Sequence, residues 1–134
     1  MDIKDKQMDN NTLDQSMLES LELKKSVLSY LGLAQRGRNA VSGEFSVESA
    51  IKGYKAFLVI VADDASAHTK KMFTNMCSFY EVPLYFIASK EEIGRAMGYE
   101  YRASAAITDE GLSKATIKKL EMLKSLHVSK MEEN

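Results

Sequence analysis

Cysteine, histidine, proline and tryptophan are scarce in this chain of 134 residues, which holds one cysteine, two histidines, one proline and no tryptophan. The single cysteine, Cys77, cannot form a disulfide within the chain. His68 and His127 lie at the start of one expected helix and near the C-terminus, so they cannot complete a catalytic triad or a zinc site. We therefore expect no metal, no cofactor and no enzymatic activity.

Long apolar runs and an excess of charge of one sign are also absent. No run approaches the roughly 20 residues of a membrane-spanning helix, and the polar start of the chain does not resemble a signal peptide. We expect a cytoplasmic protein with no membrane partner. The formal net charge is −1, so no basic field covers the whole molecule, and any surface for nucleic acid must be a local patch.

The most prominent apolar run of the chain covers residues 57–62 and is followed directly by Asp63 and Asp64. An uninterrupted run of this length predicts a buried strand. A strand that is apolar on both faces needs helices on both sides of its sheet. This segment therefore predicts a layered α/β fold.

The rest of the chain predicts helices that alternate with strands. Helices are expected over residues 16–36, 44–52, 66–80 and 90–97 and from about residue 111 onward, and further strands over residues 39–43, 84–88 and 103–108. The helix over 90–97 carries the clearest start, a capping box of Ser89 and Glu92, and it ends at Gly98. This order predicts a three-layer α/β/α sandwich in one domain over residues 16–126. Residues 1–15 and 127–134 are interpreted as flexible tails.

Apolar residues at helical spacing predict which side of the first two helices is buried. In the first helix this side carries Leu18, Leu21, Val27, Leu28, Leu31 and Ala34. In the second helix it carries Phe45, Val47, Ala50 and Ile51.

Asp63 and Asp64 are placed where open α/β sheets usually bind ligands, at the C-terminal end of a central strand. One interpretation is a site that holds a metal or accepts a phosphoryl group, although the lysine that receiver-type domains need is missing. The favoured interpretation is that a carboxylate or Ser66 caps the following helix, which stabilises it by about 1 kcal/mol. Cys77, in the middle of an amphipathic helix, is interpreted as a structural residue.

A glycine turn at Gly43 is followed at once by a helix start, where backbone N–H groups attract phosphate. Basic residues flank it: Arg36 and Arg38 before the turn, and Lys52 and Lys55 after it. This combination fits phosphate contacts to a nucleic acid. A solvated surface explains the same residues equally well, and two acidic residues, Glu44 and Glu48, weaken the patch.

A second candidate segment is the loop before the last strand, which carries Tyr99, Tyr101 and Arg102. Aromatic rings and arginine planes are the groups on which unpaired RNA bases stack. Tyrosines that merely cover the end of the sheet are an equally weighted interpretation.

These segments together resemble the L7Ae/L30e-like ribosomal protein superfamily, and within it the bacterial YlxQ-type branch of ribosome-associated proteins. The resemblance covers about residues 24–120. Its landmarks are the glycine turn, the apolar strand that ends in acidic residues, and the segments EVPLYFI, IGRAMG and AAIT. It implies a four-stranded mixed sheet within the α/β/α sandwich.

Known members of this superfamily bind kink-turn RNA through the glycine turn, with the motif Gly-x-Asn-Glu-x-x-Lys, and through the loop before the last strand. Matching the motif places Gly43 on the glycine, Phe45 on the asparagine, Ser46 on the glutamate and Ser49 on the lysine. Only the glycine is kept, so the motif is degenerate. Phosphate and shape contacts remain available without the base-reading residues.

We therefore expect a non-catalytic protein that binds structured RNA, ribosomal RNA above all, or associates with the ribosome. The expected RNA-binding residues are Arg36, Arg38, Gly43, Glu44, Phe45, Ser46, Ser49, Lys52, Tyr99, Tyr101 and Arg102. One alternative is a protein-interaction module on the same fold, with Phe45 as an exposed contact and no RNA binding. A further alternative is a phosphoacceptor domain that uses Asp63 and Asp64.

Overall fold

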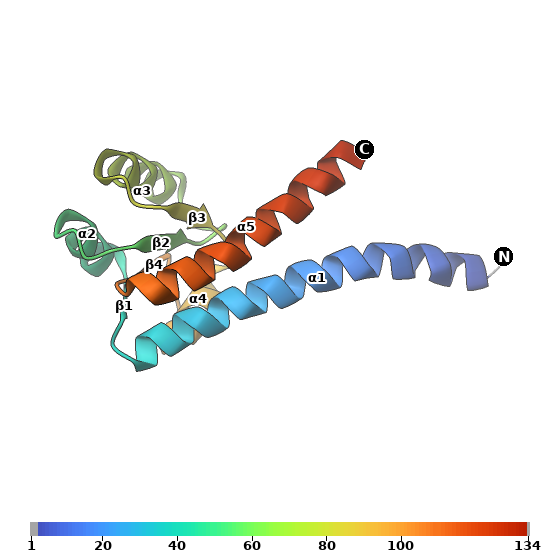
Figure 1. The fold of residues 1–134 in the computed structure, drawn as a ribbon, viewed down its shortest axis with the longest axis horizontal. Coiled ribbons are helices and arrows are strands. Elements are labelled where there is room, and N and C mark those ends of the chain that lie inside the picture. The colour runs from blue at the N-terminus through green and yellow to red at the C-terminus, as the bar shows by residue number, and fades with distance from the viewer. Residues whose placement is uncertain (1–2, 134) are drawn as a thin grey trace.

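The computed structural model describes the backbone of residues 3–133 and the side chains of residues 15–127. Five helices alternate with four strands in this part of the chain (Figure 1). The helices are α1 (Ile3–Arg36), α2 (Glu44–Lys52), α3 (Ala67–Tyr80), α4 (Lys90–Met97) and α5 (Glu110–Glu133). The strands are β1 (Ala40–Ser42), β2 (Leu58–Val61), β3 (Leu84–Phe86) and β4 (Ser104–Ile107).

The four strands form one mixed sheet in the order β1-β4-β2-β3. Strands β2 and β3 are parallel, whereas β4 runs antiparallel to both of its neighbours, β1 and β2. Helices α2 and α3 cover one face of the sheet, and α1, α4 and α5 cover the other (Figure 1). The expected three-layer α/β/α sandwich with a four-stranded mixed sheet is confirmed.

The core is centred on the apolar run that the sequence marks as a buried strand. All four residues of β2, Leu58, Val59, Ile60 and Val61, are at most 1% exposed, as are Ala105, Ala106 and Ile107 of β4 beside it. These two central strands have helices on both faces, which explains why β2 is uniformly apolar rather than alternating.

The strand directions define two opposite ends of the sheet. Because β1 and β2 are both antiparallel to β4, they run in the same direction. Gly43 directly follows β1 and Arg102 shortly precedes β4, so both lie at one end of the sheet, here called the Gly43 end. Arg38 precedes β1 and Tyr54 precedes β2, so both lie at the other end, here called the Tyr54 end.

The two terminal helices are longer than the sequence predicts. Helix α1 begins at Ile3 rather than at Ser16, and α5 continues to Glu133. The added residues lack an apolar stripe, but no proline or glycine interrupts them, and extending an existing helix adds one hydrogen bond per residue. The expected helix start is therefore wrong, and backbone in both expected tails is helical. The division into one domain with two tails stays a prediction.

Burial along α1 follows the sequence pattern only where the helix lies over the rest of the domain. Val27 and Leu31 are fully buried, as expected. Leu18 and Leu21, expected on the same buried side, are 54% and 45% exposed. The reason is that the N-terminal part of α1 extends beyond the sheet (Figure 1).

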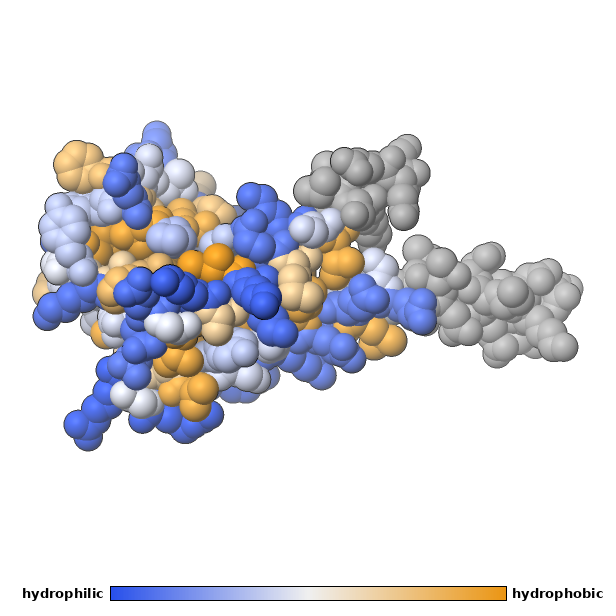
Figure 2. Space-filling view, viewed as in Figure 1, coloured by the Kyte–Doolittle hydropathy of each residue, from blue (hydrophilic) through white to orange (hydrophobic). Residues whose placement is uncertain are grey.

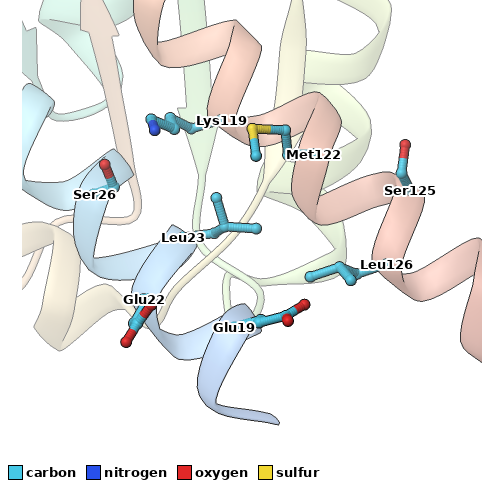
Figure 3. Close-up of a pocket in the computed structure, with 8 residues that line it drawn as sticks. All are labelled: Glu19, Glu22, Leu23, Ser26, Lys119, Met122, Ser125 and Leu126. Atoms are coloured by element: carbon cyan, nitrogen blue, oxygen red, sulfur yellow. The ribbon is translucent and has the colours of Figure 1, made fainter. Parts of the chain in front are cut away.

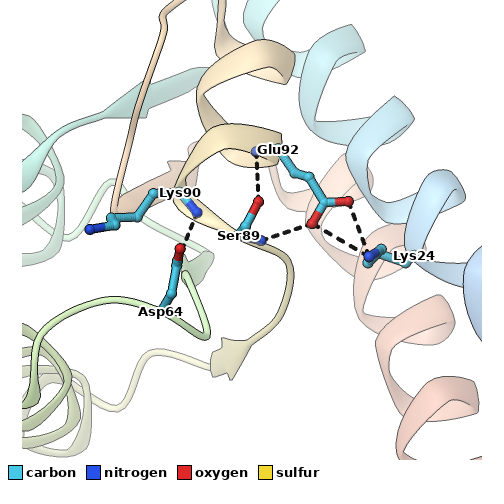
Figure 4. A network of polar contacts seen from close by, with 5 residues as sticks. All are labelled: Lys24, Asp64, Ser89, Lys90 and Glu92. Atoms are coloured by element: carbon cyan, nitrogen blue, oxygen red, sulfur yellow. Dashed lines mark hydrogen bonds and ion pairs between the residues drawn. The ribbon is translucent and has the colours of Figure 1, made fainter.

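The start of α4 is held by a connected set of polar contacts (Figure 4). The Ser89 hydroxyl accepts a hydrogen bond from the Glu92 N–H at 3.0 Å, and the Glu92 carboxylate accepts one from the Ser89 N–H at 2.9 Å. This is the expected capping box. Lys24 of α1 pairs with Glu92 at 3.0 Å, and Asp64 accepts a hydrogen bond from the Lys90 N–H at 2.8 Å. The network thus joins α1, α4 and the end of β2.

The charge of Glu92 makes part of the stability depend on pH. Partial burial acts to raise the pKa of Glu92, but the Ser89 hydrogen bond and the Lys24 ion pair outweigh it, so the pKa is lowered. The stabilisation is therefore present above the unfolded value of about 4.3 and is lost as the pH falls through the lower folded value. We expect Glu92→Gln to lower the free energy of unfolding by roughly 0.5–1 kcal/mol at pH 7, and by less at pH 3.

Urea unfolding of both proteins at the two pH values measures this difference. Glu91→Gln is the control, because Glu91 is exposed and pairs only with Arg95 one turn along the same helix. If Glu92→Gln lowers the free energy of unfolding equally at pH 3 and pH 7, the charge of Glu92 is not the source of the stabilisation.

Candidate nucleic-acid interface

The glycine turn leads into α2 with a backbone that favours glycine. Gly43 has φ 92°, in the left-handed region, and it occupies the N-cap position of α2 without a side-chain cap. Its N–H donates to the Ser104 carbonyl at 3.0 Å, which fixes the turn against β4. Because Gly43 has no side chain, the cap residue does not cover the N–H groups at the start of α2. Uncovered N–H groups at a helix start can bind a phosphate.

Arg102 joins the loop of residues 99–102 to this turn. Its Nε donates a hydrogen bond to the Ser42 hydroxyl at 2.9 Å, and its guanidinium carbon lies 3.6 Å from the centre of the Tyr99 ring. A Cβ built on Gly43 would lie 3.8 Å from Arg102 Nε. The structure therefore brings together Gly43, Tyr99 and Arg102, three residues that the sequence names in two separate segments.

This arrangement fixes the orientation of the Arg102 guanidinium. Ser42 engages Nε, while the two terminal nitrogens carry four more N–H groups, which can bind two oxygens of a phosphate or a base edge. Stacking on Tyr99 limits the rotation of the plane. The result is a cationic, flat, preoriented group beside an open glycine turn.

Arg36 borders the same loop from the end of α1. It lines a hollow of about 610 Å³ together with Arg95, Met97, Gly98 and Tyr99. Arg36 therefore lies near Tyr99, the ring on which Arg102 stacks.

Arg38 and Lys52 are not part of this group. Arg38 lies at the Tyr54 end, and the five positions that separate it from Gly43 span roughly 16 Å of extended chain. Lys52 is the last residue of α2, about 12 Å along the helix axis from its first residue, and it pairs with Glu48 at 2.8 Å. The hydrogen bond and charge of Glu48 raise the pKa of Lys52. The expected continuous patch from Arg38 through Gly43 to Lys52 is therefore divided between the two ends of the sheet.

The degenerate motif positions lie on the exposed side of α2. Phe45 is 81% exposed, and Glu44, Ser46 and Ser49 are exposed as well. The expectation that Phe45 packs inward with Val47 is wrong, because two residues along a helix turn the side chain through about 200°. Phe45, Ser49 and Lys52 form an exposed stripe along α2.

The other candidate sites have structural explanations. Ser66 caps α3 by accepting a hydrogen bond from the Thr69 N–H, and Asp64 caps the start of α4 instead. Within the described residues, no three histidine, cysteine or acidic side chains are grouped to hold a metal. Burial raises the pKa of the Cys77 thiol to about 11, so this residue stays uncharged at neutral pH.

A hollow of about 600 Å³ lies between α1 and α5 (Figure 3). Leu23 of α1 and Met122 and Leu126 of α5 supply its apolar lining, with Glu19 and Lys119 beside them. It holds no histidine or cysteine and contributes no group to the Arg102 arrangement.

None of the helices in the described part of the chain is long and apolar enough to span a membrane.

Two residues that shape the Gly43 end were not singled out from the sequence. Ser42 anchors Arg102 across 60 positions of sequence, and no local pattern reveals that contact. Gly94 lies inside α4, and a Cβ there would meet the backbone of Glu100 and Tyr101 at 2.8 Å. Its signal was available, because an isolated glycine inside a helical pattern usually has a packing reason.

Comparison with known sequences gives one family and named relatives. Residues 25–117 match the family described as ribosomal protein L7Ae/L30e/S12e/Gadd45. The chain is 41% identical over 91 residues to RNA-binding protein YlxQ of Bacillus subtilis (strain 168), a match that covers 68% of this chain and 91% of that protein. It is 35% identical over 98 residues to RNA-binding protein YlxQ of Enterococcus faecium, covering 73% and 94% of the two chains.

Solved structures with the same fold include two informative cases. A protein of unknown function from Bacillus halodurans C superposes with a TM-score of 0.68 at 34% identity, covering 71% of this chain and 96% of that one. The Giardia lamblia 15.5kD RNA binding protein superposes with a TM-score of 0.65 at 24% identity, covering 78% and 90%. At that identity the second comparison supports the fold alone.

Proposed function

Because the chain belongs to the ribosomal protein L7Ae/L30e/S12e/Gadd45 family, we propose that it is a non-catalytic protein that binds structured RNA at the Gly43 end. The single observation that carries this proposal is Arg102, which Ser42 and Tyr99 hold beside the open glycine turn. The relatives named RNA-binding protein YlxQ support the same class of partner. Ribosomal RNA or the ribosome as the particular partner, and a cytoplasmic location, belong to the proposal.

The proposed recognition depends on RNA shape and backbone. In this chain Phe45 and Ser46 stand where kink-turn binders of the superfamily carry the asparagine and glutamate that read base edges. Each base-edge contact of that kind is worth about 1–3 kcal/mol of discrimination. Gly43 still allows a close approach of the RNA backbone to the start of α2, and Arg102 and Arg36 supply positive charge. We therefore expect a bent RNA to be bound with weak sequence preference.

A salt titration tests this proposal. The full chain is titrated with a kink-turn RNA, a regular helix of equal length and ribosomal RNA, and affinity is measured at several salt concentrations. The expected result is tighter binding to the kinked or ribosomal RNA than to the helix, with log affinity falling linearly against log salt. No binding to any of the three RNAs at low salt would refute the proposal.

Arg38 gives a graded prediction, because it lies at the Tyr54 end and makes no contact with the Arg102 group. We expect Arg38→Ala to reduce RNA affinity only about two- to threefold and to lower the salt slope by about one, as for loss of one phosphate contact. Lys124→Ala on α5 is a matched control of equal charge change. If Arg38→Ala and Lys124→Ala leave affinity and salt slope equally unchanged, Arg38 lies outside the RNA site.

The alternative function is a protein-interaction module, and the exposure of Phe45 favours it. An aromatic side chain that is 81% exposed at a helix start suits a protein partner as well as a stacked base. The RNA titration decides between them, because a module without RNA binding would bind none of the three probes.

A further inference from the structure

Three aromatic residues gather at the Tyr54 end, away from the Gly43 end. Tyr54, in the connection from α2 to β2, is 77% exposed, and Phe79, near the end of α3, is 79% exposed. Tyr80 lies between them, with ring centroids 5.5 Å from Tyr54 and 4.9 Å from Phe79 and edge-to-face angles of 69° and 73°. These three residues are called the Tyr54 cluster. In the space-filling view, apolar and weakly polar side chains are interspersed with hydrophilic ones at the end of the molecule where α2 and α3 lie (Figure 2).

The backbone holds Tyr54 in a conformation that bulky residues rarely adopt. Its φ is 57°, in the left-handed region, although glycine occupies the position just before it. The turn requires this conformation: the Tyr54 N–H donates to the Ile51 carbonyl at 3.1 Å, and the Lys55 N–H donates to the Ala50 carbonyl at 2.9 Å. A glycine at position 54 would satisfy the same turn without a steric cost. A strained, exposed aromatic residue is the kind of outlier that points to a function.

The charges at the Tyr54 end balance. Lys55 is exposed next to Tyr54, and Arg38 is exposed at the same end of the sheet. Lys52 pairs with Glu48, and Glu81 is exposed after α3. Asp109 and Glu110 directly follow β4, the strand between β1 and β2, so they lie at the same end, where Glu110 pairs with Lys114 at 3.2 Å. Four basic groups therefore accompany four acidic ones, so attraction for RNA here comes from the aromatic rings and not from an excess of charge.

The Tyr54 cluster is continuous with the proposed RNA surface through α2. The helix begins directly after Gly43 and ends just before Gly53, and its nine residues cover about 13 Å. Its exposed stripe of Phe45, Ser49 and Lys52 connects the two ends. A few nucleotides of single strand are long enough to reach from one end to the other.

We propose that the Tyr54 cluster stacks an unpaired base of the RNA whose structured part is bound at the Gly43 end. The inference rests on the proposed function and names a second contact for it. Tyr54 and Phe79 present exposed aromatic surface, with the Tyr80 ring between them. Lys55 is the exposed cation next to Tyr54. Stacking tolerates any base, since every base has a flat face, so this contact adds affinity without sequence preference.

The test compares two structured RNAs that differ only in a four-nucleotide uridine extension, together with a free twelve-nucleotide oligouridine. The full chain and the variants Tyr54→Gly, Phe79→Ala and Tyr54→Phe are titrated with each probe. Tyr54→Gly and Phe79→Ala are expected to bind the extended RNA and the oligouridine about five- to tenfold more weakly, with unchanged binding to the RNA without extension. Tyr54→Phe keeps the ring and is expected to bind like the unmodified chain.

Urea unfolding distinguishes a variant that has lost the stacking contact from one that has lost its fold. Tyr54→Gly relieves the left-handed strain, so its urea midpoint is expected to be equal to or above that of the unmodified chain while its affinity falls. Phe79→Ala lies on a different element and provides an independent readout.

The outcomes distinguish the two proposals. If the unmodified chain binds neither structured RNA, but binds oligouridine in a manner that depends on Tyr54 and Phe79, the proposed function fails and the stacking surface stands. If both variants bind every probe like the unmodified chain, the stacking surface is overturned, and the exposed aromatic rings are assigned to a protein partner.

Discussion

Arg102→Ala is expected to reduce RNA affinity about 10- to 100-fold, the largest effect of any single charge removal in this protein. Charge-assisted hydrogen bonds contribute about 1.5–3 kcal/mol when the group is preoriented. Arg102 is preoriented by the Ser42 hydrogen bond at 2.9 Å and by the Tyr99 ring at 3.6 Å. The measurement is the RNA titration at fixed salt, with urea unfolding to show that the variant is folded. Affinity within twofold of the unmodified chain would remove Arg102 from the site.

The form of the Arg102 site can be tested with smaller changes. Arg102→Lys keeps the charge but loses the planar group and the Nε contact, so it is expected to recover little of the affinity. Ser42→Ala keeps Arg102 but removes its anchor, and we expect an intermediate loss of about three- to fivefold. Lys124→Ala on α5 is again the matched control, because it removes one positive charge from a helix that contributes no residue to the Arg102 group. Unchanged RNA affinity of Arg102→Lys would mean that only the positive charge of Arg102 contributes to binding and that its stacking on Tyr99 does not.

The fold could be predicted from local sequence because its elements are bounded by residues with a clear physical role. The run of residues 57–62 marks β2, Gly43 and Gly53 bound α2, and Ser89 with Glu92 starts α4. The ends of α1 and α5 were missed for the complementary reason: they contain no residue that stops a helix and no apolar stripe that reveals one. A helix of that kind is defined by propagation from its packed part rather than by its own pattern.

The candidate site was predictable in its parts and less so in its arrangement. Gly43 and the loop with Tyr99 and Arg102 were named from residue chemistry, and the family resemblance joined them. Their contact depends on the register of two strands, in which Ser42 faces Ala105, and register is a tertiary property. The same register moves Arg38 to the opposite end of the sheet, although it is close to Gly43 in sequence.

Gly94→Ala is expected to lower the free energy of unfolding by about 1–3 kcal/mol, the largest effect on stability that we predict. A Cβ at this position would lie 2.8 Å from the Glu100 carbonyl group and from Tyr101 Cα. These are backbone atoms, so no side-chain rotation relieves the clash. The loop is also tied to α4 on both sides of the contact, by the Tyr99 N–H to the Gly94 carbonyl at 2.7 Å and the Arg102 N–H to the Lys90 carbonyl at 2.9 Å.

The same substitution elsewhere separates this clash from the intrinsic preference of alanine for helices. Gly111→Ala in α5 meets its nearest atom at an ordinary 3.5 Å, so we expect it to be neutral or to stabilise by up to about 1 kcal/mol. Changes of opposite sign in the free energy of unfolding at Gly94 and Gly111 would show that close packing of the loop on α4, and not the helix preference of alanine, determines the effect at Gly94.

The displaced loop carries Tyr99 and Arg102, so the RNA affinity of the folded Gly94→Ala protein is expected to fall about tenfold. Normal affinity in a destabilised Gly94→Ala protein would mean that the contacts of Arg102 survive the displacement of the loop, and unchanged stability would rule out the close approach itself.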